Sequence, residues 1–245
     1  MVNFGRETLL LFPCCAEKAR GGGKWTEDGN QLAGLVGTDI FSRVLAVRQS
    51  LLDNLKQTSR YISGKYNKNT AIVSGPDFGQ SNYNGQYMPA IKRYTGSLYT
   101  AVPGFADLVQ RSRTNKNTPD MLILSALYGP LAPLDLIQDY NLKISDPLAY
   151  QTWKKIFPWF LREYIKAQNI ERIILYFGGS THYLKVGRLG VEPLLKGNLL
   201  KQVIHYEVEN GNAYHTPHNH GLLIGSDAGW LTEPKLTRVV QKEIW

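Results

Sequence analysis

Short, unbroken apolar runs separated by helical patterns constrain the fold of this chain more than any other feature. Runs of this length and composition are typical of strands that crossover helices bury on both faces, because such strands have no polar side facing water. The predicted strands are Thr8–Phe12, Thr70–Ser74, Met121–Leu124, Arg172–Phe177, Gln202–Val208 and Leu222–Gly225.

Apolar residues at helical spacing fill the segments between these runs. Helices are predicted at residues 41–57, 105–113, 147–168 and 181–189, and the segment 233–245 is also expected to be helical. Asp39 is a candidate N-cap of the first helix, and Pro158 inside the third predicts a kink or restart. This alternation predicts a single α/β domain over residues 1–245, with a mostly parallel central sheet of about six strands and helices on both faces.

The charge of the chain indicates a polyanionic partner. It carries 28 Lys and Arg against 20 Asp and Glu, which gives a net charge of +8 and a pI near 9.4. A surplus of this size favours nucleic acid, and the 14 Tyr and 5 Trp add ring faces that can stack on unpaired bases. The alternative is that the charge only keeps the protein soluble. DNA, double-stranded or locally unpaired, is the predicted partner, and no obligate protein partner is evident.

The sequence carries no sign of a membrane span or of secretion. No apolar run approaches the roughly 20 residues needed to cross a bilayer. The start of the chain has a short apolar stretch without a cleavage-site pattern, and it fits a first strand better than a secretory signal. The two cysteines, Cys14 and Cys15, are adjacent. Neighbouring cysteines form a disulfide only with strain, so reduced thiols in the cytoplasm are expected.

Glycine, proline, aromatic and polar residues follow each of the first four predicted strands. These exits begin with PCCAEK, GPDFGQ, ALYGPL and GGSTHY. In open parallel sheets, ligands bind beyond the carboxyl ends of the strands, so the four exits share the rim where a site is expected. Loops that only connect elements usually lack such a combination of glycine, proline, aromatic and polar residues. A ligand site at this rim is therefore predicted.

The third exit, SALYGPLAPLDLIQDYNL, resembles the central motif of the YaaA-like peroxide-stress proteins, a family linked with DNA binding. The residues that fit the motif are Ser125, Leu127, Tyr128, Gly129, Leu131, Pro133, Leu134, Asp135, Ile137 and Tyr140. Other positions are also similar to family segments: Pro13 and Lys18 after the first strand, Gly96 and Tyr99, and Thr181–Val186. The similarity is thus spread over most of the chain, and the central motif is its specific part.

The chain also departs from the family pattern. Ala132 stands where the motif usually has arginine, and Ser97 stands where an acidic residue is usual. Near the end, HTPHNHG replaces a segment rich in lysine and arginine. The resemblance therefore implies a distant member with an altered pocket. A related branch includes prokaryotic DNA glycosylases that excise modified bases in defence against phages, which implies a base-excising activity here.

Two carboxylates are the candidate catalytic groups. Asp135 lies between leucines in the third exit, where partial desolvation would raise its pKa. Asp77 follows the second predicted strand. A carboxylate at this rim could stabilise an oxocarbenium-like sugar or activate water, as in glycosyl transfer. The alternative is structural for both: Asp135 caps a turn or the next helix, and Asp77 belongs to a Pro-Asp turn.

Aromatic, polar and basic side chains near the exits are the candidate base- and DNA-binding groups. Flipped-base pockets stack the base between rings and read its edge with polar groups, and cations suit phosphate contacts. Gly129 would let the backbone approach a ligand closely. Lys18 could also act as an amine nucleophile. Core packing of the rings and solvated surface cations are the alternatives. The predicted set is Tyr128, Phe78, Gly129, Tyr99, Tyr94, Arg93, Lys18, Tyr140 and Ser125.

Three histidines and a glycine pair complete the candidate groups. His215, His218 and His220 could bind zinc, but no cysteine joins them, so a DNA or phosphate contact or plain surface is preferred. Gly178-Gly179-Ser180 could cradle a phosphate, although no Walker lysine follows and nucleotide hydrolysis is not expected. No metal is predicted, and no organic cofactor is required.

Together these observations predict a DNA glycosylase that flips a modified or damaged base out of DNA and hydrolyses its N-glycosidic bond, in antiphage defence. Two alternatives stay open. A DNA-binding stress protein without catalysis would hold bent or unpaired DNA with the same tyrosines and cations. A hydrolase acting on a small molecule or on RNA could use the same pocket, because pockets at strand ends serve many chemistries.

Overall fold

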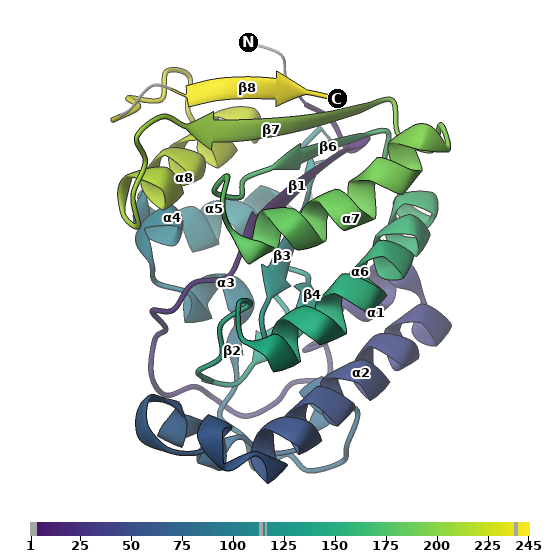
Figure 1. The fold of residues 1–245 in the computed structure, drawn as a ribbon, viewed down its shortest axis with the longest axis vertical. Helices are drawn as coiled ribbons and strands as arrows, with labels where there is room; N and C mark the ends of the chain where they lie inside the picture. The colour runs from purple at the N-terminus through teal and green to yellow at the C-terminus, as the bar shows by residue number, and fades with distance from the viewer. Residues whose placement is uncertain (1–3, 113–114, 116, 238–239) are drawn as a thin grey trace.

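The computed structural model describes residues 4–112, 115, 117–237 and 240–245, and a mostly parallel sheet runs through its centre (Figure 1). The strand order is β4-β3-β1-β6-β7-β8. The parallel strands are β3 (Asp120–Ser125), β1 (Thr8–Pro13), β6 (Arg172–Leu175) and β7 (Gln202–Val208). The edge strands β4 (Gly129–Leu131) and β8 (Val240–Ile244) pair antiparallel, and β2 (Met88–Pro89) and β5 (Leu136–Ile137) form a separate antiparallel pair. Leu10 of β1 pairs with Met121 on one side and with Ile174 on the other.

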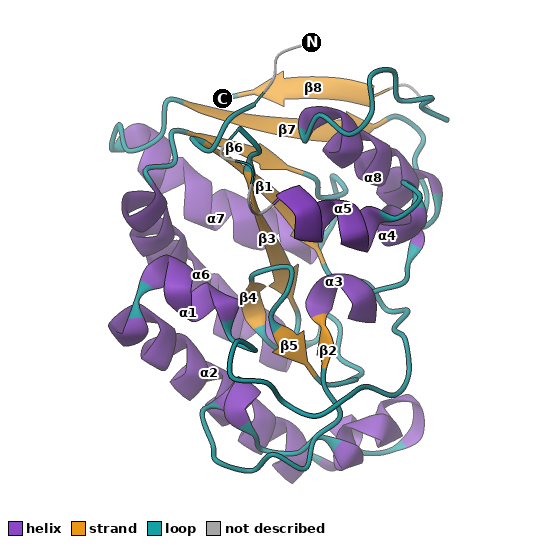
Figure 2. Cartoon of the chain, turned by 180° about the vertical axis from the view of Figure 1, so that it is seen from behind, coloured by secondary structure: helices purple, strands orange, loops and turns teal. Residues whose placement is uncertain are grey.

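Helices cover both faces of the sheet. They are α1 (Gln31–Val36), α2 (Thr38–Gln57), α3 (Ala90–Arg93), α4 (Ser97–Thr100), α5 (Phe105–Ser112), α6 (Pro147–Gln168), α7 (His182–Lys196) and α8 (His215–Asp227). Figure 2 shows α3, α4, α5 and α8 in front of the sheet, with α6 and α7 behind it. Helix α2 packs along α6. This arrangement explains why the inner strands are apolar on both faces.

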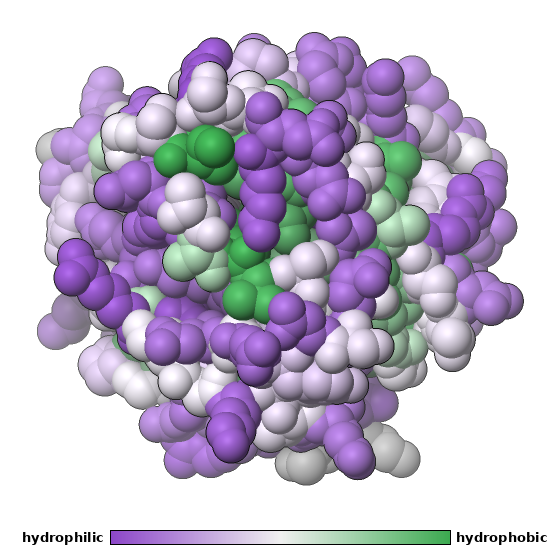
Figure 3. Space-filling model, turned by 90° about the horizontal axis from the view of Figure 1, so that it is seen from below, coloured by the Kyte–Doolittle hydropathy of each residue, from purple (hydrophilic) through white to green (hydrophobic). Residues whose placement is uncertain are grey.

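The core lies around the three inner strands β3, β1 and β6. Residues 9–12, 122–124 and 173–175 are fully buried. The face seen from below in Figure 3 is mainly hydrophilic, with a narrow hydrophobic band. No helix in the described part of the chain combines the length and the apolar composition needed to cross a bilayer. The predicted α/β class and the mostly parallel sheet are confirmed.

Two predicted strands do not belong to the sheet. Thr70 and Ala71 end a 3-10 helix (Gly64–Ala71), and the residues after it are irregular. The Gln138 side chain takes both hydrogen bonds of Val73, accepting from its N–H at 2.8 Å and donating to its carbonyl at 2.7 Å, so no neighbouring strand is needed. The second wrong strand, at residues 222–225, lies inside α8. A short apolar run fits a buried helix as well as a buried strand, which is why periodicity misassigned it.

The edges of the sheet also differ from expectation. Neither β4 nor β8 was predicted, and the segment 233–245, expected to be helical, contributes β8, which pairs with β7 and covers its edge. The predicted helices at 41–57, 105–113 and 147–168 correspond to α2, α5 and α6, although residue 113 lies outside the described residues. Gly37 rather than Asp39 is the N-cap of α2, α6 continues through Pro158, and α7 extends beyond the predicted 181–189.

The order of the parallel strands creates one topological switch point. From β1 the chain crosses to β3 on one side, and from there it returns past β1 to β6 on the other side. The connections that leave β1 and β6 therefore diverge at their carboxyl ends. In open α/β sheets the crevice at such a point is where ligands bind. The exits of β1 and β6 mark the expected position of a site.

Candidate functional site

A cavity of about 840 Å³ lies at this switch point. The exit of β1 contributes Pro13–Glu17 and the exit of β6 contributes Gly178–Thr181. Further lining comes from residues 96–99 at the start of α4, from Tyr176 and Tyr183, and from residues between Glu207 and His220 at the end of β7 and after it. In Figure 1 the carboxyl end of β7 points toward α8. Two of the predicted exits, the first and the fourth, therefore meet in one cavity, as the topology requires.

Tyrosines form part of the cavity wall. The Tyr99 hydroxyl donates a 2.8 Å hydrogen bond to the Pro13 carbonyl, and Tyr183 Oη lies 2.9 Å from Cys14 Sγ. The Tyr183 ring also stacks on Phe177, with 5.9 Å between ring centres and 23° between planes. These contacts hold Tyr99 and Tyr183 in place in the cavity wall.

Two carboxylates line the same cavity from different strand exits. Glu17 is exposed after β1, and Glu207 is half-buried at the end of β7. A β carbon at Gly179 would overlap the Glu207 carboxylate. A β carbon at Gly96 would lie 3.8 Å from Glu17 Oε2. Glycine at position 179 thus leaves the room that the Glu207 carboxylate occupies.

A buried cluster of hydroxyl groups lies behind Cys14. Tyr140 Oη is 2.8 Å from Ser125 Oγ, 3.1 Å from Tyr94 Oη and 3.3 Å from Cys14 Sγ. Burial raises the pKa of Tyr94 and of Tyr140 well above the ordinary value, so both phenols stay protonated. Three of the predicted binding residues therefore come together, as support for the cavity wall.

Lys18 lies against this cluster. Its ammonium group donates a 2.9 Å hydrogen bond to the Cys15 carbonyl and lies 4.2 Å from the centre of the Tyr140 ring. Desolvation lowers the pKa of Lys18, while the ring face stabilises its charged form. Lys18 is therefore half-buried behind the residues that line the cavity, and its ammonium group has partners within the protein.

Asp135 is fully buried and holds backbone groups. Its Oδ1 accepts from the Leu32 N–H and its Oδ2 from the Ala132 N–H, both at 2.9 Å. Burial raises the pKa of Asp135 to about 6, against the opposing effect of Arg48 and of these hydrogen bonds. Asp135 is not among the residues that line the switch-point cavity. In this arrangement the carboxylate caps a turn, the alternative interpretation of its sequence.

Asp77, Phe78 and Tyr128 do meet, but in the interior. The Tyr128 hydroxyl donates to Asp77 Oδ2 at 2.8 Å, and the Gln138 amide donates to the same oxygen at 3.0 Å. The Phe78 and Tyr128 rings are 5.1 Å apart. Burial raises the pKa of Asp77 to about 7, although these donors oppose the shift. Since all three predicted residues are buried, they form a polar core element below the surface.

Arg48, which was not singled out from the sequence, joins this interior network. From α2 it donates to the carbonyls of Tyr128 and Pro130, each at 2.8 Å. It is almost fully buried. An arginine on the apolar face of a predicted helix is the signal that could have revealed this role, because a buried guanidinium needs several acceptors.

Gly129 and Arg93 both have close partners within the protein. Gly129 has a φ of 64°, and a β carbon there would overlap the Trp153 ring, so the close approach is to a side chain of α6. Arg93 is buried and donates to four backbone carbonyls, including Ala19 at 2.6 Å and Gly21 at 2.9 Å. The guanidinium thus holds the glycine-rich segment 19–23 in place through its carbonyl groups, and it is not exposed to solvent.

The three histidines do not converge. His220 is buried, with Nε2 2.9 Å from the Tyr206 carbonyl, and burial lowers its pKa to about 4. His215 and His218 instead flank Tyr214. Within the residues that the structure describes, no group of three or more His, Cys, Asp or Glu side chains is arranged to hold a metal ion.

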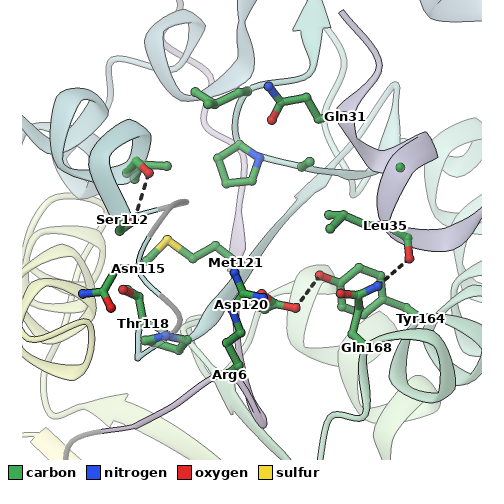
Figure 4. A pocket seen from close by; sticks show the side chains of 16 residues that line it. Arg6, Gln31, Leu35, Ser112, Asn115, Thr118, Asp120, Met121, Tyr164 and Gln168 are labelled. Carbon is green, nitrogen blue, oxygen red and sulfur yellow. Dashed lines mark hydrogen bonds between the residues drawn. The ribbon is translucent and has the colours of Figure 1, made fainter. Parts of the chain in front are cut away.

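A second cavity, of about 360 Å³, lies at the opposite end of the sheet (Figure 4). Asp120 at the start of β3 lines it together with Arg6, and the Tyr164 hydroxyl donates to Asp120 at 3.3 Å. Because this cavity lies at an amino end of the parallel strands, it lacks the topological advantage of the switch point.

Several lining residues were missed by the reasoning from sequence. Glu207, Tyr176 and Tyr183 all line the switch-point cavity. Glu207 closes the predicted strand 202–208, so examining the exit of this fifth strand would have revealed it. Tyr183 lies in the segment Thr181–Val186 that resembles the family, but the resemblance did not place it among the predicted site residues.

The chain is similar to known bacterial proteins. A sequence model described as the peroxide stress protein YaaA matches residues 42–215. A UPF0246 protein of Lactobacillus delbrueckii subsp. bulgaricus is 28% identical over 149 residues, which cover 60% of this chain and 58% of that protein. A UPF0246 protein of Shewanella sp. (strain MR-4) is 32% identical over 144 residues, 56% of this chain and 51% of the relative. The chain thus spans about half the length of the curated relatives it matches.

Proposed function

The chain belongs to the family of the peroxide stress protein YaaA, and from the cavity at its switch point we propose that it is a DNA N-glycosylase that excises a modified or damaged base. The name of this family refers to peroxide stress and does not specify a reaction. The reaction is inferred from the chemistry of the cavity.

One observation carries the proposal: a cavity with tyrosines in its wall holds two carboxylates at the point where the sheet topology favours ligand binding. Its volume of about 840 Å³ lies within the roughly 300–1,000 Å³ typical of ligand pockets. A flipped base stacks on rings, and hydrolysis of a glycosidic bond uses carboxylates. Tyrosines and carboxylates both occur in the lining of this cavity, which supports the proposal.

Glu207 is the proposed catalytic carboxylate. It is less exposed than Glu17, and a carboxylate acts more strongly on a developing positive charge where less water screens it. As the bond between C1′ and the base nitrogen breaks, its electron pair leaves with the base. Glu207 stabilises the sugar cation and accepts a proton from water, whose oxygen bonds to C1′. The proton then passes to the departing base, which completes the hydrolysis.

Other groups supply binding. Tyr99 and Tyr183 are proposed to contact the flipped base. The glycine pair after β6 and the start of α7 offer backbone N–H groups to a phosphate, where Thr181 already caps the helix by accepting from the Leu184 N–H. The net charge of +8 favours association with DNA.

Asp135 and Asp77 are assigned supporting roles in this proposal. Each is fully buried and already accepts hydrogen bonds from protein donors. The predicted catalytic role of Asp135 remains a competing assignment. It predicts that Asp135→Asn abolishes base release in a folded protein, while Glu207→Gln leaves it unchanged.

The experiment that tests the reaction is incubation with ordinary, oxidatively or alkylation-damaged and phage-modified DNAs. Alkaline cleavage then reveals abasic sites, and mass spectrometry identifies the released base. Release from one class of DNA is the expected outcome. Stable binding without abasic sites on every DNA would instead support a DNA-binding protein without catalysis.

The cellular role follows from the substrate in this proposal. Excision of a base that only phage DNA carries would act in antiphage defence. Both cysteines are free thiols, which supports a reducing compartment, and we propose that the protein acts in the cytoplasm.

A further inference from the structure

An exposed tyrosine, stacked on a half-buried histidine, lies beside the switch-point cavity. The Tyr214 side chain is 57% exposed, whereas most tyrosines of the described chain are buried or half-buried. Its ring stacks on His218, with centres 5.5 Å apart and planes 11° apart, and His215 meets it edge-on at 5.5 Å. The core does not account for this pair, because the Tyr214 ring faces water.

The backbone that carries Tyr214 is held in place. Asn212 Oδ1 accepts from the Tyr214 N–H at 2.9 Å and from the His215 N–H at 2.8 Å. The Ser97 hydroxyl donates to the Tyr214 carbonyl at 3.4 Å. A ring on a fixed backbone has lost part of its freedom before a ligand arrives, which lowers the entropic cost of binding.

The position of the pair connects it with the cavity. Residues on both sides of Tyr214, namely Ala213 and Thr216, line the cavity, and so does Ser97. A strand that inserts one nucleotide into the cavity would therefore bring a neighbouring nucleotide close to Tyr214. Ring faces bind any unpaired base, since every base has a π-face.

We propose that the stacked rings of Tyr214 and His218 bind an unpaired base next to the nucleotide in the cavity, and that the substrate is therefore single-stranded or locally unpaired DNA. This inference rests on the proposed function, because it uses the same cavity. It adds the strand state of the substrate and a residue that selects it.

The test uses the full-length protein and a short single-stranded DNA with one 2-aminopurine, whose fluorescence falls when it stacks. Tyr214→Ala should weaken binding roughly 5- to 100-fold, the range expected for loss of one stacked base. It should also abolish the fluorescence quenching. Tyr214→Trp should retain both, because its ring is at least as large. Tyr83→Ala is the matched control, since Tyr83 is 59% exposed but is not among the residues that line the cavity.

Two results would overturn the inference. One is equal affinity and equal quenching for Tyr214→Ala and the wild type, with both proteins shown to be folded by circular dichroism. The other is exclusive binding to fully paired duplex DNA or to RNA. The outcome is separate from that of the proposed function: binding that depends on Tyr214 without base release would contradict the glycosylase alone, and base release insensitive to Tyr214→Ala would contradict the stacking role alone.

Discussion

The Glu207 carboxylate occupies the space that a β carbon at Gly179 would need. The two residues come from the exits of neighbouring strands, β7 and β6, which places a carboxylate directly against the glycine pair of the cavity. Gly179 belongs to the glycine pair noted in the sequence, whereas Glu207 was not among the predicted site residues. A substitution at Gly179 can therefore displace the Glu207 carboxylate without replacing Glu207 itself.

Gly179→Ala should displace Glu207 and reduce base release while the protein stays folded. The overlap is with the end of a flexible side chain, so the carboxylate can turn away at little cost in stability. Single-turnover base release and thermal unfolding of this variant provide the measurement. Gly34→Ala, at a glycine with open space around it on α1, is the control. Equal base release by Gly179→Ala and wild type would separate Glu207 from the chemistry.

Asp77 should make the stability of the protein depend on pH. Its pKa is about 7 in the folded protein and about 3.9 in an unfolded chain, so the folded state holds the proton more tightly. The free energy of unfolding should therefore fall as pH rises from about 4 to 7.

Asp77→Asn removes this titration and keeps an acceptor for Tyr128. The variant should gain about 1–3 kcal/mol relative to the wild type between pH 5 and pH 8, measured by urea denaturation at both pH values. A wild-type stability that rises over this range in step with the variant would contradict the burial argument.

Asp135→Ala should destabilise the protein by about 2–4 kcal/mol, because it leaves the Leu32 and Ala132 N–H groups buried without their acceptor. Asp135→Asn, which keeps one acceptor oxygen, should lose less. Urea denaturation compares the two variants. Loss of stability by neither variant would show that the capping role is unimportant.

Gly129→Ala should cost more than an ordinary glycine substitution. Both Gly129 and Gly104 have positive φ angles, 64° and 70°, but only at Gly129 would the new methyl group meet the Trp153 ring. Gly104→Ala should lose about 1–2 kcal/mol from backbone strain alone, and Gly129→Ala clearly more. Thermal unfolding of the matched pair measures the difference. Equal losses would mean that Trp153 adjusts without cost.

The buried inner strands could be predicted from the sequence because their burial leaves a local apolar pattern. The run at residues 9–12 is apolar because helices bury both of its faces, and this is visible without knowing which helices do so. The strand predicted at residues 70–74 was wrong because the backbone there bonds to the side chain of Gln138, far along the chain, and, within the described residues, to no neighbouring strand. No local pattern contains such a contact.

The candidate site could likewise be predicted only in part. The sequence predicted a site at the ends of the strands, and the topology brings the exits of β1 and β6 together in a cavity there. It did not reveal that Asp135 faces the Leu32 backbone, or that Glu207 faces Gly179. The direction of a side chain at a strand end depends on tertiary neighbours, and spacing along the sequence does not encode them.

The most direct test of the account is single-turnover release of the base by Glu207→Gln on the DNA that the wild type attacks. The exposed Glu192→Gln on α7 is the control, since it makes the same chemical change outside the residues that line the cavity. The account predicts that Glu207→Gln slows base release by roughly 10²- to 10⁴-fold, the usual contribution of a positioned proton acceptor, while DNA affinity and stability are retained. Release by Glu207→Gln at the wild-type rate would contradict it.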